Sequence, residues 1–499
     1  MTAVDRHDPR WWWVVGAAAV AGLALRIAAA QGGLWTDEAW SVIYAAEARD
    51  AIGVFLRINH DNNHHLYSLW LQAIGMNAPP LLARLPAIIA GTLCIPAAAL
   101  VVARRSAWAG IVAALLFAVS PTMVNFGSEA RGYSLMLLAA LVMLWLATDA
   151  VEGHERRATP WWVALAALLG MLSHMTMAAP VALVTLWVYL DRRAALGPSA
   201  AMRKSARLMG PALAATAAVV LFVFAVAGAS PTGMRLGGYV PFGWLNFTAA
   251  LDDLTDWTAG LTLVELWVAP ALLAVAALWI GLCPPAWLGA RARLYAILIL
   301  AVPLGAGLVQ SGNSGFARYY LSSAIGLLLL ASEWIGRGLG KGGAARVAAA
   351  ALLGVVVLAG LWRDSLLINL QRGRPDGPVA FMEQRSPHGA RVALDPKRLE
   401  GPLTVAAHRA GYGIGIAKGC APADYVLAAP LPMVRASPTI TRCGVTMRAL
   451  AWSATSTLTG DAWILYGPKT LQTAGAPVSG PAPGASNRRL SGRAGVAQG

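Results

Sequence analysis

Two adjacent carboxylates, Asp37 and Glu38, give the strongest chemical signal in the chain. Acidic residues are scarce, with 24 Asp and Glu against 39 Lys and Arg among 499 residues. The pair follows the first apolar run and lies between Trp35 and Trp40, which places it at the edge of a membrane, where charged groups are costly and usually functional. A carboxylate there can take a proton from a hydroxyl group or bind a cation. The alternative is a solvated loop that contains two acids.

Three further polar clusters interrupt the apolar sequence. They are His60-Asp61-Asn62-Asn63-His64-His65, Ser128-Glu129-Ala130-Arg131-Gly132-Tyr133 and Phe316-Ala317-Arg318-Tyr319-Tyr320. Each one alone is also typical of ordinary membrane-surface residues, because Tyr and Arg favour that depth. Together with the acidic pair they supply carboxylates, imidazoles and guanidiniums on one side of a membrane. Such groups deprotonate hydroxyls and hold phosphates.

The composition indicates a polytopic membrane protein. Hydrophobic residues make up 57% of the chain and charged residues 13%, whereas soluble domains have about 25% charged residues. The formal charge of +15 does not indicate nucleic-acid binding, because the basic residues lie between apolar runs and not in one patch. The four cysteines form no CxxC pair, so zinc and thioredoxin-type sites have no support.

Eleven apolar runs are interpreted as membrane spans, which makes the fold class mainly α. They cover about residues 11–30, 83–103, 107–121, 131–149, 160–174, 176–190, 207–229, 264–283, 293–311, 318–336 and 345–362. Basic loops alternate along the chain with loops that are poor in Lys and Arg. The poor loops are at 121–130, 230–263 and 311–317, and this alternation predicts a cytoplasmic N-terminus. The first run could instead be a signal peptide, but its length and the lack of a clear cleavage site favour a retained span.

The first external loop, 31–82, is too polar to cross the membrane. Residues 47–56 and 65–76 are predicted to form short helices on its surface, since the second is shorter than the ~20 residues that a span needs. Residues 1–362 thus form a transmembrane domain, and 363–470 a small extracytoplasmic α/β domain. Cys420 and Cys443 lie in that domain on the oxidising side, which predicts a disulfide; two free thiols are the alternative. Residues 471–499 are rich in Gly, Pro, Ala and Ser and are expected to be disordered.

The motifs, taken in order, resemble those of the GT-C class of membrane glycosyltransferases. They are Leu34-Trp35-Thr36-Asp37-Glu38-Ala39, the stretch from Asp61 to Tyr67, Arg84-Leu85-Pro86, Glu129-Ala130-Arg131-Gly132-Tyr133 and Arg318-Tyr319. More narrowly the chain is similar to the bacterial family-39 branch, which includes protein O-mannosyltransferases, lipid A aminoarabinose transferases and rhizobial galacturonosyltransferases. The resemblance covers about 1–340. It departs at Asn62-Asn63-His64-His65, where many members carry His-Pro-Pro or Lys-Pro-Pro.

This resemblance implies a hexosyl or pentosyl transferase of the EC 2.4 class with a polyprenyl-phosphate sugar as donor. It implies that Asp37 is the general base on an extracytoplasmic acceptor hydroxyl, that Glu129 positions the acceptor or a metal, and that arginines hold the lipid phosphate. One base and one phosphate clamp suffice for a single inverting displacement. The predicted catalytic residues are Asp37, Glu38 and Glu129, and the predicted donor- and substrate-binding residues are His60, Asp61, His64, Arg131, Tyr133, His174, Arg318 and Tyr319.

Partners and location follow from the same resemblance. The expected partners are the lipid-linked sugar, the bilayer and a glycolipid, polysaccharide or protein acceptor in the envelope of a bacterial inner membrane. No cofactor is required; a divalent metal at Asp37, Asp61 or Glu129 is an open alternative, because the spacing fixes no ligand geometry. His174 lies in a charge-free stretch, which favours a hydrogen-bonded structural histidine over contact with the donor phosphate.

A transporter or flippase of lipid-linked sugars is the competing class. It would share the spans and the phosphate-binding arginines, but it would not need Asp37 and Glu38 at the membrane surface. Transporters also place polar groups near the bilayer midplane and show internal repeats, and the sequence has neither feature. A simple anchor for the C-terminal domain would need far fewer than eleven spans.

The alternation of basic loops predicts where reporter fusions will be found. Fusions at Arg105, Arg157 and Gly340 should report the cytoplasm, and a fusion after Gly373 should report the opposite side, because Lys and Arg are retained on the cytoplasmic side. Paired alkaline phosphatase and green fluorescent protein fusions measure this. A reversal at any one of the four sites would contradict the eleven-span topology.

Overall fold

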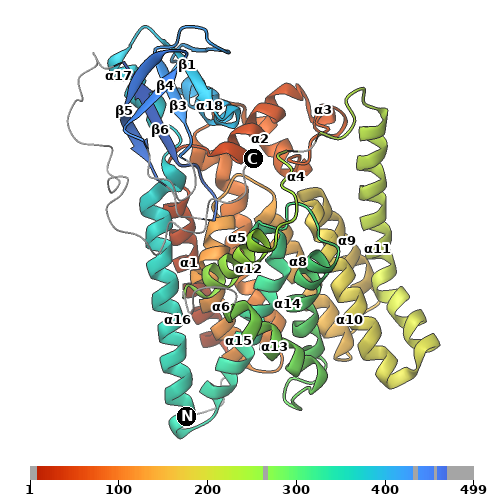
Figure 1. Cartoon of the computed structure of the whole chain (residues 1–499). Helices are drawn as coiled ribbons and strands as arrows, with labels where there is room; N and C mark the ends of the chain where they lie inside the picture. Colours follow the sequence, from red (N-terminus) through yellow and green to blue (C-terminus); the bar gives the residue numbers. More distant parts are fainter. Residues whose placement is uncertain (1–7, 236, 262–267, 431–436, 455–457, 469–499) are drawn as a thin grey trace. The chain divides into compact units, whose positions relative to one another are not determined.

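The computed structural model describes residues 8–235, 237–261, 268–430, 437–454 and 458–468. The tail expected to be disordered, 471–499, lies outside the described residues. The described chain is mainly helical and ends in a mixed β-sheet (Figure 1). It divides into two compact units. The first consists of Met1–Ala28, His64–Tyr67 and Leu85–Ser365, and the second of Ala29–Asn63, Ser68–Arg84 and Leu366–Gly499.

Helices form at all eleven apolar runs. They are α1 (Pro9–Ala29), α5 (Pro80–Ala103), α6 (Ala107–Val119), α8 (Tyr133–Val151), α9 (Thr159–Ser173), α10 (Ala178–Leu196), α11 (Pro198–Ala229), α13 (Val268–Leu282), α14 (Arg291–Leu308), α15 (Leu321–Gly340) and α16 (Gly343–Leu370). Among the described helices, six are long and apolar enough to cross a membrane, and three more are shorter apolar helices. The helical, multi-pass architecture is confirmed, and the number of eleven spans stays a prediction.

Short helices occupy the connections of the first unit. They are α7 (Pro121–Phe126), the 3-10 turn η1 (Met175–Met177), α12 (Trp244–Ala259) and the 3-10 turn η2 (Ala317–Tyr320). The predicted external loop at 230–263 thus contains a helix of 16 residues. These connections carry several of the predicted site residues.

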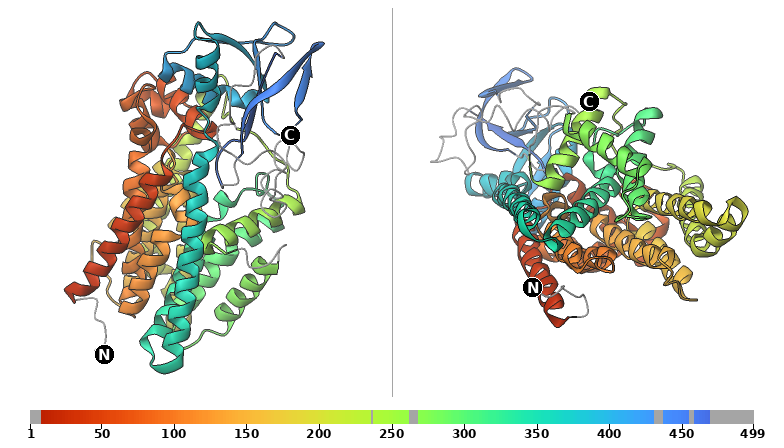
Figure 2. Two further views of the ribbon diagram at one scale, coloured as in Figure 1. Left: turned by 90° about the vertical axis from the view of Figure 1, so that its left-hand side faces the viewer. Right: turned by 90° about the horizontal axis from the view of Figure 1, so that it is seen from below.

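Small residues allow the helices of the first unit to approach closely. α6 packs against α15, and α9 packs against α8 and α11. A Cβ atom at Gly336 would lie 2.5 Å from the backbone of Ala109, so only glycine allows α15 to touch α6 there. Such backbone contact is how membrane helices associate, because lipid provides no hydrophobic force between them. Figure 2 shows these helices along their length and, in its second view, closer to end-on.

A buried ion network around Arg291 joins several of these helices. The Arg291 guanidinium donates to both carboxylate oxygens of Glu152, at 2.8 and 3.0 Å, and to Oε1 of Glu333 at 3.0 Å. Glu333 also accepts from the Tyr295 hydroxyl at 3.1 Å, and Glu152 accepts from Arg105 at 2.8 Å. The network therefore connects the residue after α8 to α14 and α15.

Removing Arg291 should destabilise this unit more than removing an exposed arginine. Arg291→Ala leaves Glu152 and Glu333 without their shared cation, and breaking a buried pair costs about 3–5 kcal/mol. Thermal unfolding of the detergent-solubilised protein should show the loss as a lower melting temperature. Arg156→Ala, at an exposed position, is the control. Equal melting temperatures for the two variants would show that the network contributes little.

The second unit is built around one six-stranded sheet, in the order β2-β1-β3-β6-β5-β4. β1 runs parallel to β2 and β3, and the other neighbours are antiparallel. The strands are β1 (Ala390–Asp395), β2 (Ile414–Ile416), β3 (Tyr425–Ala428), β4 (Thr439–Arg442), β5 (Val445–Ser453) and β6 (Trp463–Gly467). The mixed sheet confirms the predicted α/β character of this part of the chain.

Two helices belong to this sheet domain. α17 (Gly377–Arg385) precedes β1, and α18 (Glu400–Ala410) follows the turn η4 (Lys397–Leu399) and connects β1 to the parallel strand β2. Parallel neighbours need such a crossover connection. Met382 of α17 and Leu403 of α18 are buried in one cluster with Val392, Leu427 and Leu465 of the sheet.

Most of the loop predicted to be external, 31–82, belongs to the second unit as well. It forms α2 (Thr36–Glu47), α3 (Ala51–Leu56) and α4 (His65–Ile74), and α2 packs against α18. The helices predicted at 47–56 and 65–76 correspond to α3 and α4, whereas α2 was not predicted. Residues 29–63 and 68–84 group with residues 366–499 in one compact unit, and the predicted domain boundaries stay a prediction.

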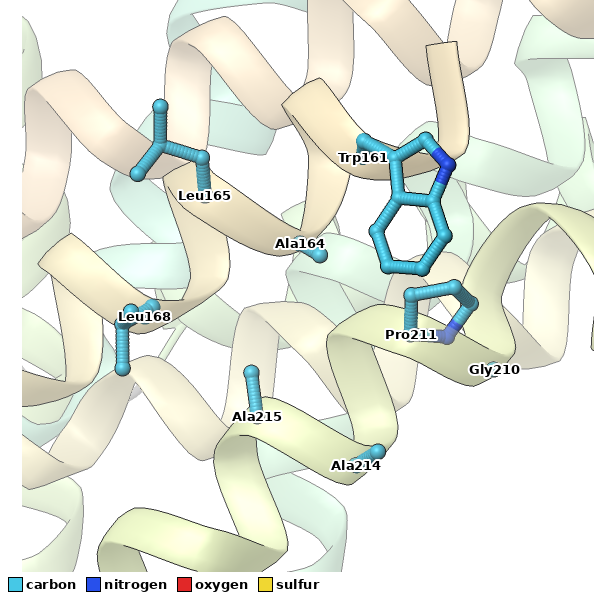
Figure 3. Close-up of a pocket in the computed structure, with 8 residues that line it drawn as sticks. All are labelled: Trp161, Ala164, Leu165, Leu168, Gly210, Pro211, Ala214 and Ala215. Carbon is cyan, nitrogen blue, oxygen red and sulfur yellow. The ribbon is translucent and has the colours of Figure 1, made fainter. Parts of the chain in front are cut away.

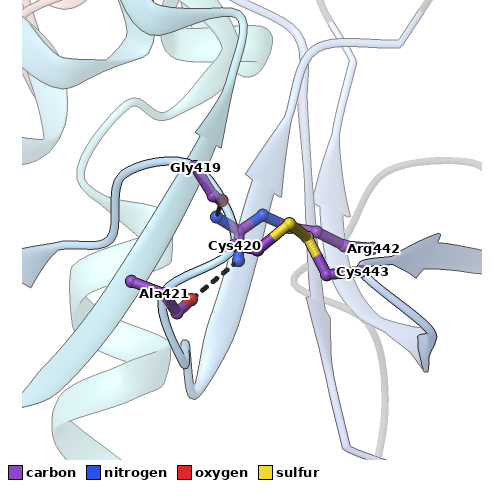
Figure 4. The surroundings of a disulfide bond; sticks show 5 residues. All are labelled: Gly419, Cys420, Ala421, Arg442 and Cys443. Atoms are coloured by element: carbon purple, nitrogen blue, oxygen red, sulfur yellow. Dashed lines mark hydrogen bonds between the residues drawn. A yellow bond between two sulfur atoms is a disulfide. The ribbon is translucent and has the colours of Figure 1, made fainter.

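A disulfide fastens one edge of the sheet domain. Cys420, in the loop after β2, is bonded to Cys443, in the turn between β4 and β5, with their Cα atoms 5.7 Å apart (Figure 4). The neighbouring Arg442 donates to the carbonyl oxygen of Ala421 at 3.1 Å and to that of Gly419. The edge hairpin is thus attached to the loop that leads into β3.

Candidate active site

The predicted site residues fall in both compact units. Asp37, Glu38, His60 and Asp61 belong to the second unit. The others belong to the first unit and are His64, Glu129, Arg131, Tyr133, His174, Arg318 and Tyr319. Each set is therefore described within its own unit.

Glu38 is held by a fully buried ion pair with Arg84. The Arg84 guanidinium donates from Nε to Oε1 of Glu38 at 2.8 Å and from its second terminal nitrogen to Oε2 at 2.5 Å, and both side chains are 0% exposed. Oε2 also accepts from the backbone N–H of Trp35 at 3.2 Å, as the third residue of a helix does in a capping box. Both oxygens are thus engaged, which favours a positioning role for Glu38.

Arg84 also fixes the loop that leads into α2. Its terminal nitrogens donate to the carbonyl oxygens of Ala30 and Gly33 at 2.8 Å each and to that of Gly32 at 2.9 Å. The chain therefore wraps around the guanidinium before α2 begins. Arg84 belongs to one motif of the family resemblance, but it was not predicted as a site residue. Its position at the start of an apolar run could have indicated a functional role.

Breaking this pair should cost stability, whichever partner is removed. Glu38→Ala leaves the Arg84 charge buried without a carboxylate, which is expected to destabilise the protein by about 3–5 kcal/mol. Replacing both residues by leucine should recover part of that loss, because no unpaired charge then remains. Melting temperatures of the single and double variants measure this. A Glu38→Ala protein that melts normally but is inactive would instead assign Glu38 a direct catalytic role.

Asp37 lies beside Glu38 in the first turn of α2 and is half-buried. Its carbonyl oxygen accepts from the Ser41 hydroxyl at 2.8 Å and from the Asn62 amide at 3.0 Å. The same amide donates to the Ser41 oxygen at 2.9 Å. Asn62, one of the residues at which the sequence departs from the family pattern, therefore braces the turn that carries Asp37.

An aromatic row adjoins this turn. The rings of Trp40 and Tyr44 stack with centroids 5.6 Å apart, and Tyr44 lies 4.7 Å from the ring of His60. Nδ1 of His60 is 2.7 Å from Oδ1 of Asp61. His60 therefore packs against α2, the helix that carries the predicted base, and Asp61 lies beside His60.

Three rings form the centre of the polar cluster in the first unit. His174 stacks on Tyr133 with centroids 4.2 Å apart and on His64 with centroids 4.6 Å apart. His174 follows the last residue of α9, and its Nδ1 lies 3.1 Å from the Thr176 backbone nitrogen and 2.8 Å from the Thr176 hydroxyl oxygen. Gly132 is required beside the stack, because a Cβ atom there would lie 1.8 Å from the carbonyl oxygen of Ser173.

Two guanidiniums belong to the same cluster. Arg131 lies over the Tyr133 ring, with its Cζ 5.0 Å from the centroid, and is 3.7 Å from Glu129. Arg318 lies over the Phe316 ring at 4.5 Å and the Tyr319 ring at 5.6 Å. Aromatic faces attract such cations and hold them in place.

The cluster keeps His64 neutral. Burial, followed by electrostatic interactions with His174, Arg131, His65 and Arg318, holds the pKa of His64 well below its usual range. Burial lowers the pKa of the neighbouring His65 to about 4. Nε2 of His64 is buried and has no hydrogen-bond partner among the described residues. A neutral imidazole among fixed cations is an arrangement that favours a bound anion.

Among the described residues, no three His, Cys, Asp or Glu side chains lie close enough together to hold one metal ion. No step of the reaction proposed below uses a metal.

An apolar groove of about 530 Å³ lies between α9 and α11 in the first unit. Trp161 of α9 points toward Pro211 of α11 (Figure 3). Its lining residues are apolar and are Trp161, Ala164, Leu165, Leu168, Gly210, Pro211, Ala214 and Ala215. Such a surface cannot carry acid–base chemistry, but it suits a hydrocarbon chain.

Two residues near Asp37 have no sequence signal of function. Asp461 of the segment before β6 accepts hydrogen bonds from Thr36, and Arg398 of η4 faces both Asp461 and Asp37. They lie more than 350 residues from α2 in sequence, so only the fold brings them to it.

One family model matches part of the chain. Residues 63–228, about a third of the chain, match the family model described as dolichyl-phosphate-mannose-protein mannosyltransferase. No curated protein matches the chain.

Several solved structures are similar to the chain at low sequence identity. ArnT from Cupriavidus metallidurans in the apo state has a TM-score of 0.49 and 14% identity, and the alignment covers 91% of this chain and 97% of that one. The same protein bound to undecaprenyl phosphate has a TM-score of 0.48, 13% identity and coverages of 92% and 98%. The apo oligosaccharyltransferase of Archaeoglobus fulgidus has a TM-score of 0.47, 12% identity and 81% coverage of this chain, which spans 64% of its length.

Proposed function

We propose that this chain is a membrane glycosyltransferase that moves a sugar from a polyprenyl-phosphate donor to a hydroxyl group of an extracytoplasmic acceptor. The match of residues 63–228 to the dolichyl-phosphate-mannose-protein mannosyltransferase family model supports this proposal. The acceptor is a lipid, a polysaccharide or a protein of the cell envelope. The proposal includes a GT-C fold with eleven spans, a cytoplasmic N-terminus and a C-terminal domain on the outside of a bacterial plasma membrane.

The electropositive cluster of the first unit is the observation that carries the proposal. Arg131 and Arg318 interact electrostatically with the uncharged His64, and the buried Nε2 of His64 has no hydrogen-bond partner among the described residues. A phosphate group there accepts charge-assisted hydrogen bonds, which are about twice as strong as neutral ones. The cluster would hold the phosphate in the ground state and neutralise its charge as the bond to the sugar breaks.

The apolar groove between α9 and α11 suits the polyprenyl tail of the same donor. His174 follows the end of α9, and the groove residues Trp161 to Leu168 lie on the same helix. At 1.5 Å per residue, the centre of the groove lies roughly 15 Å along the helix from His174. A lipid chain of a few isoprene units bridges that distance while its phosphate stays at the polar cluster.

Asp37 is the proposed base. Its neighbour Glu38 is occupied by Arg84, whereas Asp37 is half-buried in a turn braced by Asn62 and Ser41. In the proposed step the acceptor oxygen attacks the anomeric carbon, its proton passes to Asp37, and the electron pair of the breaking bond leaves with the phosphate. One displacement inverts the anomeric configuration.

A flippase of lipid-linked sugars is the competing function. It would use the same cationic cluster and groove, but it would not require a base. Purified protein supplied with a panel of polyprenyl-phosphate sugars and envelope extract separates the two functions. Mass spectrometry of new glycosylated products supports transfer, and the absence of products with movement of labelled lipid across vesicles supports the flippase.

Substitutions at Asp37 and Arg318 should affect different steps. Asp37→Asn keeps the shape of the side chain and removes its basicity, so turnover should fall by ~10²-fold or more with little change in donor binding. Arg318→Ala should mainly weaken donor binding, because it removes a phosphate contact that exists before the reaction. Transfer rates and binding of labelled donor measure the two effects.

Exposed residues provide the controls for these variants. Glu47→Gln lies at the other end of α2, and Arg207→Ala lies on α11, and both positions are exposed. Neither should change transfer or donor binding. If Asp37→Asn retained normal turnover, the base would have to be Glu38, Asp61 or Glu129. If both site variants altered only lipid movement, the flippase would replace the proposed function.

A further inference from the structure

We propose that Asp461 of the C-terminal domain is a positioning residue for Asp37, acting through Thr36, and that Arg398 supplies the cation that faces both carboxylates. This inference rests on the proposed function, in which Asp37 is the base. All four residues belong to the second compact unit. The C-terminal domain would then complete the catalytic turn of the enzyme.

Asp461 caps the helix that carries Asp37. Its Oδ2 accepts the backbone N–H of Thr36 at 2.6 Å, and its two carboxylate oxygens lie 2.8 and 2.9 Å from the Thr36 hydroxyl. The first N–H groups of a helix have no intrahelical acceptor, and the preceding residue, Trp35, has no side-chain acceptor to offer. A residue 425 positions away therefore supplies the cap.

Contacts within the C-terminal segment fix the backbone around Asp461. The Asp461 backbone N–H donates to the carbonyl oxygen of Arg372 at 3.0 Å. The Trp463 indole donates to the carbonyl oxygens of Gly373 and Arg374 at 2.8 and 3.1 Å. Gly373 has a φ of +86°, and a Cβ atom there would lie 1.9 Å from the Asp461 carbonyl oxygen. Because Asp461 is fixed in this way, its hydrogen bonds also fix the position of Thr36.

Arg398 adds an electrostatic contact to the same turn. Its charge interacts with both Asp461 and Asp37, and its Nε is buried with no hydrogen-bond partner among the described residues. Its carbonyl oxygen accepts from the Trp40 indole at 3.4 Å. A Cβ atom at Gly401 would lie 2.8 Å from that indole nitrogen, so glycine permits this close approach to α2. A cation facing both carboxylates reduces their mutual repulsion.

Asp461 also predicts how turnover depends on pH. Burial raises the pKa of Asp461 to about 6, against the lowering effect of the Thr36 hydrogen bonds and Arg398, and Asp37 raises it further. Above pH 6 the carboxylate is charged and accepts fully from Thr36; below pH 6 it gains a proton and caps the helix less well. Turnover should therefore fall as the pH decreases through about 6, and the Asp461→Asn variant should lack this step.

The decisive experiment compares Asp461→Asn with Asp424→Asn in the full-length protein. The Asp461 variant keeps one acceptor oxygen, so it should fold, while kcat should fall by about 10-fold or more with the donor KM unchanged. Asp424 accepts a backbone N–H from Arg391 at 2.7 Å at an exposed position of the same domain, so its variant should behave like the wild type. Thr36→Ala should give a loss of kcat that does not add to that of Asp461→Asn.

Three outcomes separate this inference from the proposed function. Normal kcat per folded molecule for Asp461→Asn, with Asp37→Asn inactive, would overturn only the positioning role. A loss confined to melting temperature would also overturn it, because a purely structural contact leaves kcat and the pH step unchanged. Normal turnover of Asp37→Asn would overturn the proposed base and this inference together.

Discussion

The position of Asp37 depends on a charge pair that has no contact with water. Taking Glu38 and Arg84 out of solvent costs several kcal/mol per ion, which is recovered only when each donor finds an acceptor. All three guanidinium nitrogens of Arg84 have acceptors, either on Glu38 or on the loop carbonyls at residues 30–33. Few other arrangements satisfy so many groups, so the loop and the first turn of α2 are fixed together.

Two neighbouring carboxylates therefore have opposite surroundings for a geometric reason. Successive residues of a helix point about 100° apart, so the turn that buries Glu38 leaves Asp37 half-exposed. A group that is sealed in an ion pair cannot accept a proton without breaking that pair, whereas a half-exposed one can. The Asp-Glu order of the motif thus assigns the two acids different tasks, one that sets the geometry and one that is available for chemistry.

The sequence predicted the parts of the structure that have a strong local pattern. The apolar runs predicted the helices, and the family resemblance directed attention to Asp37, Glu129, Arg131 and Arg318. β2 has three residues and β4 has four exposed or half-buried ones, so neither has the periodicity that identifies a strand. Asp461 and Arg398 carry no motif at all, because their relation to α2 exists only after the sheet domain has folded.

The residues of the cationic cluster share one further property, which is their place at the ends of helices. Tyr133 begins α8, His174 follows α9, and Arg318 lies in the turn before α15. The chain changes direction at such points, so polar side chains can converge there without interrupting a membrane span. A transporter needs its polar groups near the middle of the bilayer, commonly on broken helices. A cluster at helix ends instead suits the proposed function, in which a phosphate is held at the membrane boundary and an acceptor from water reaches the sugar.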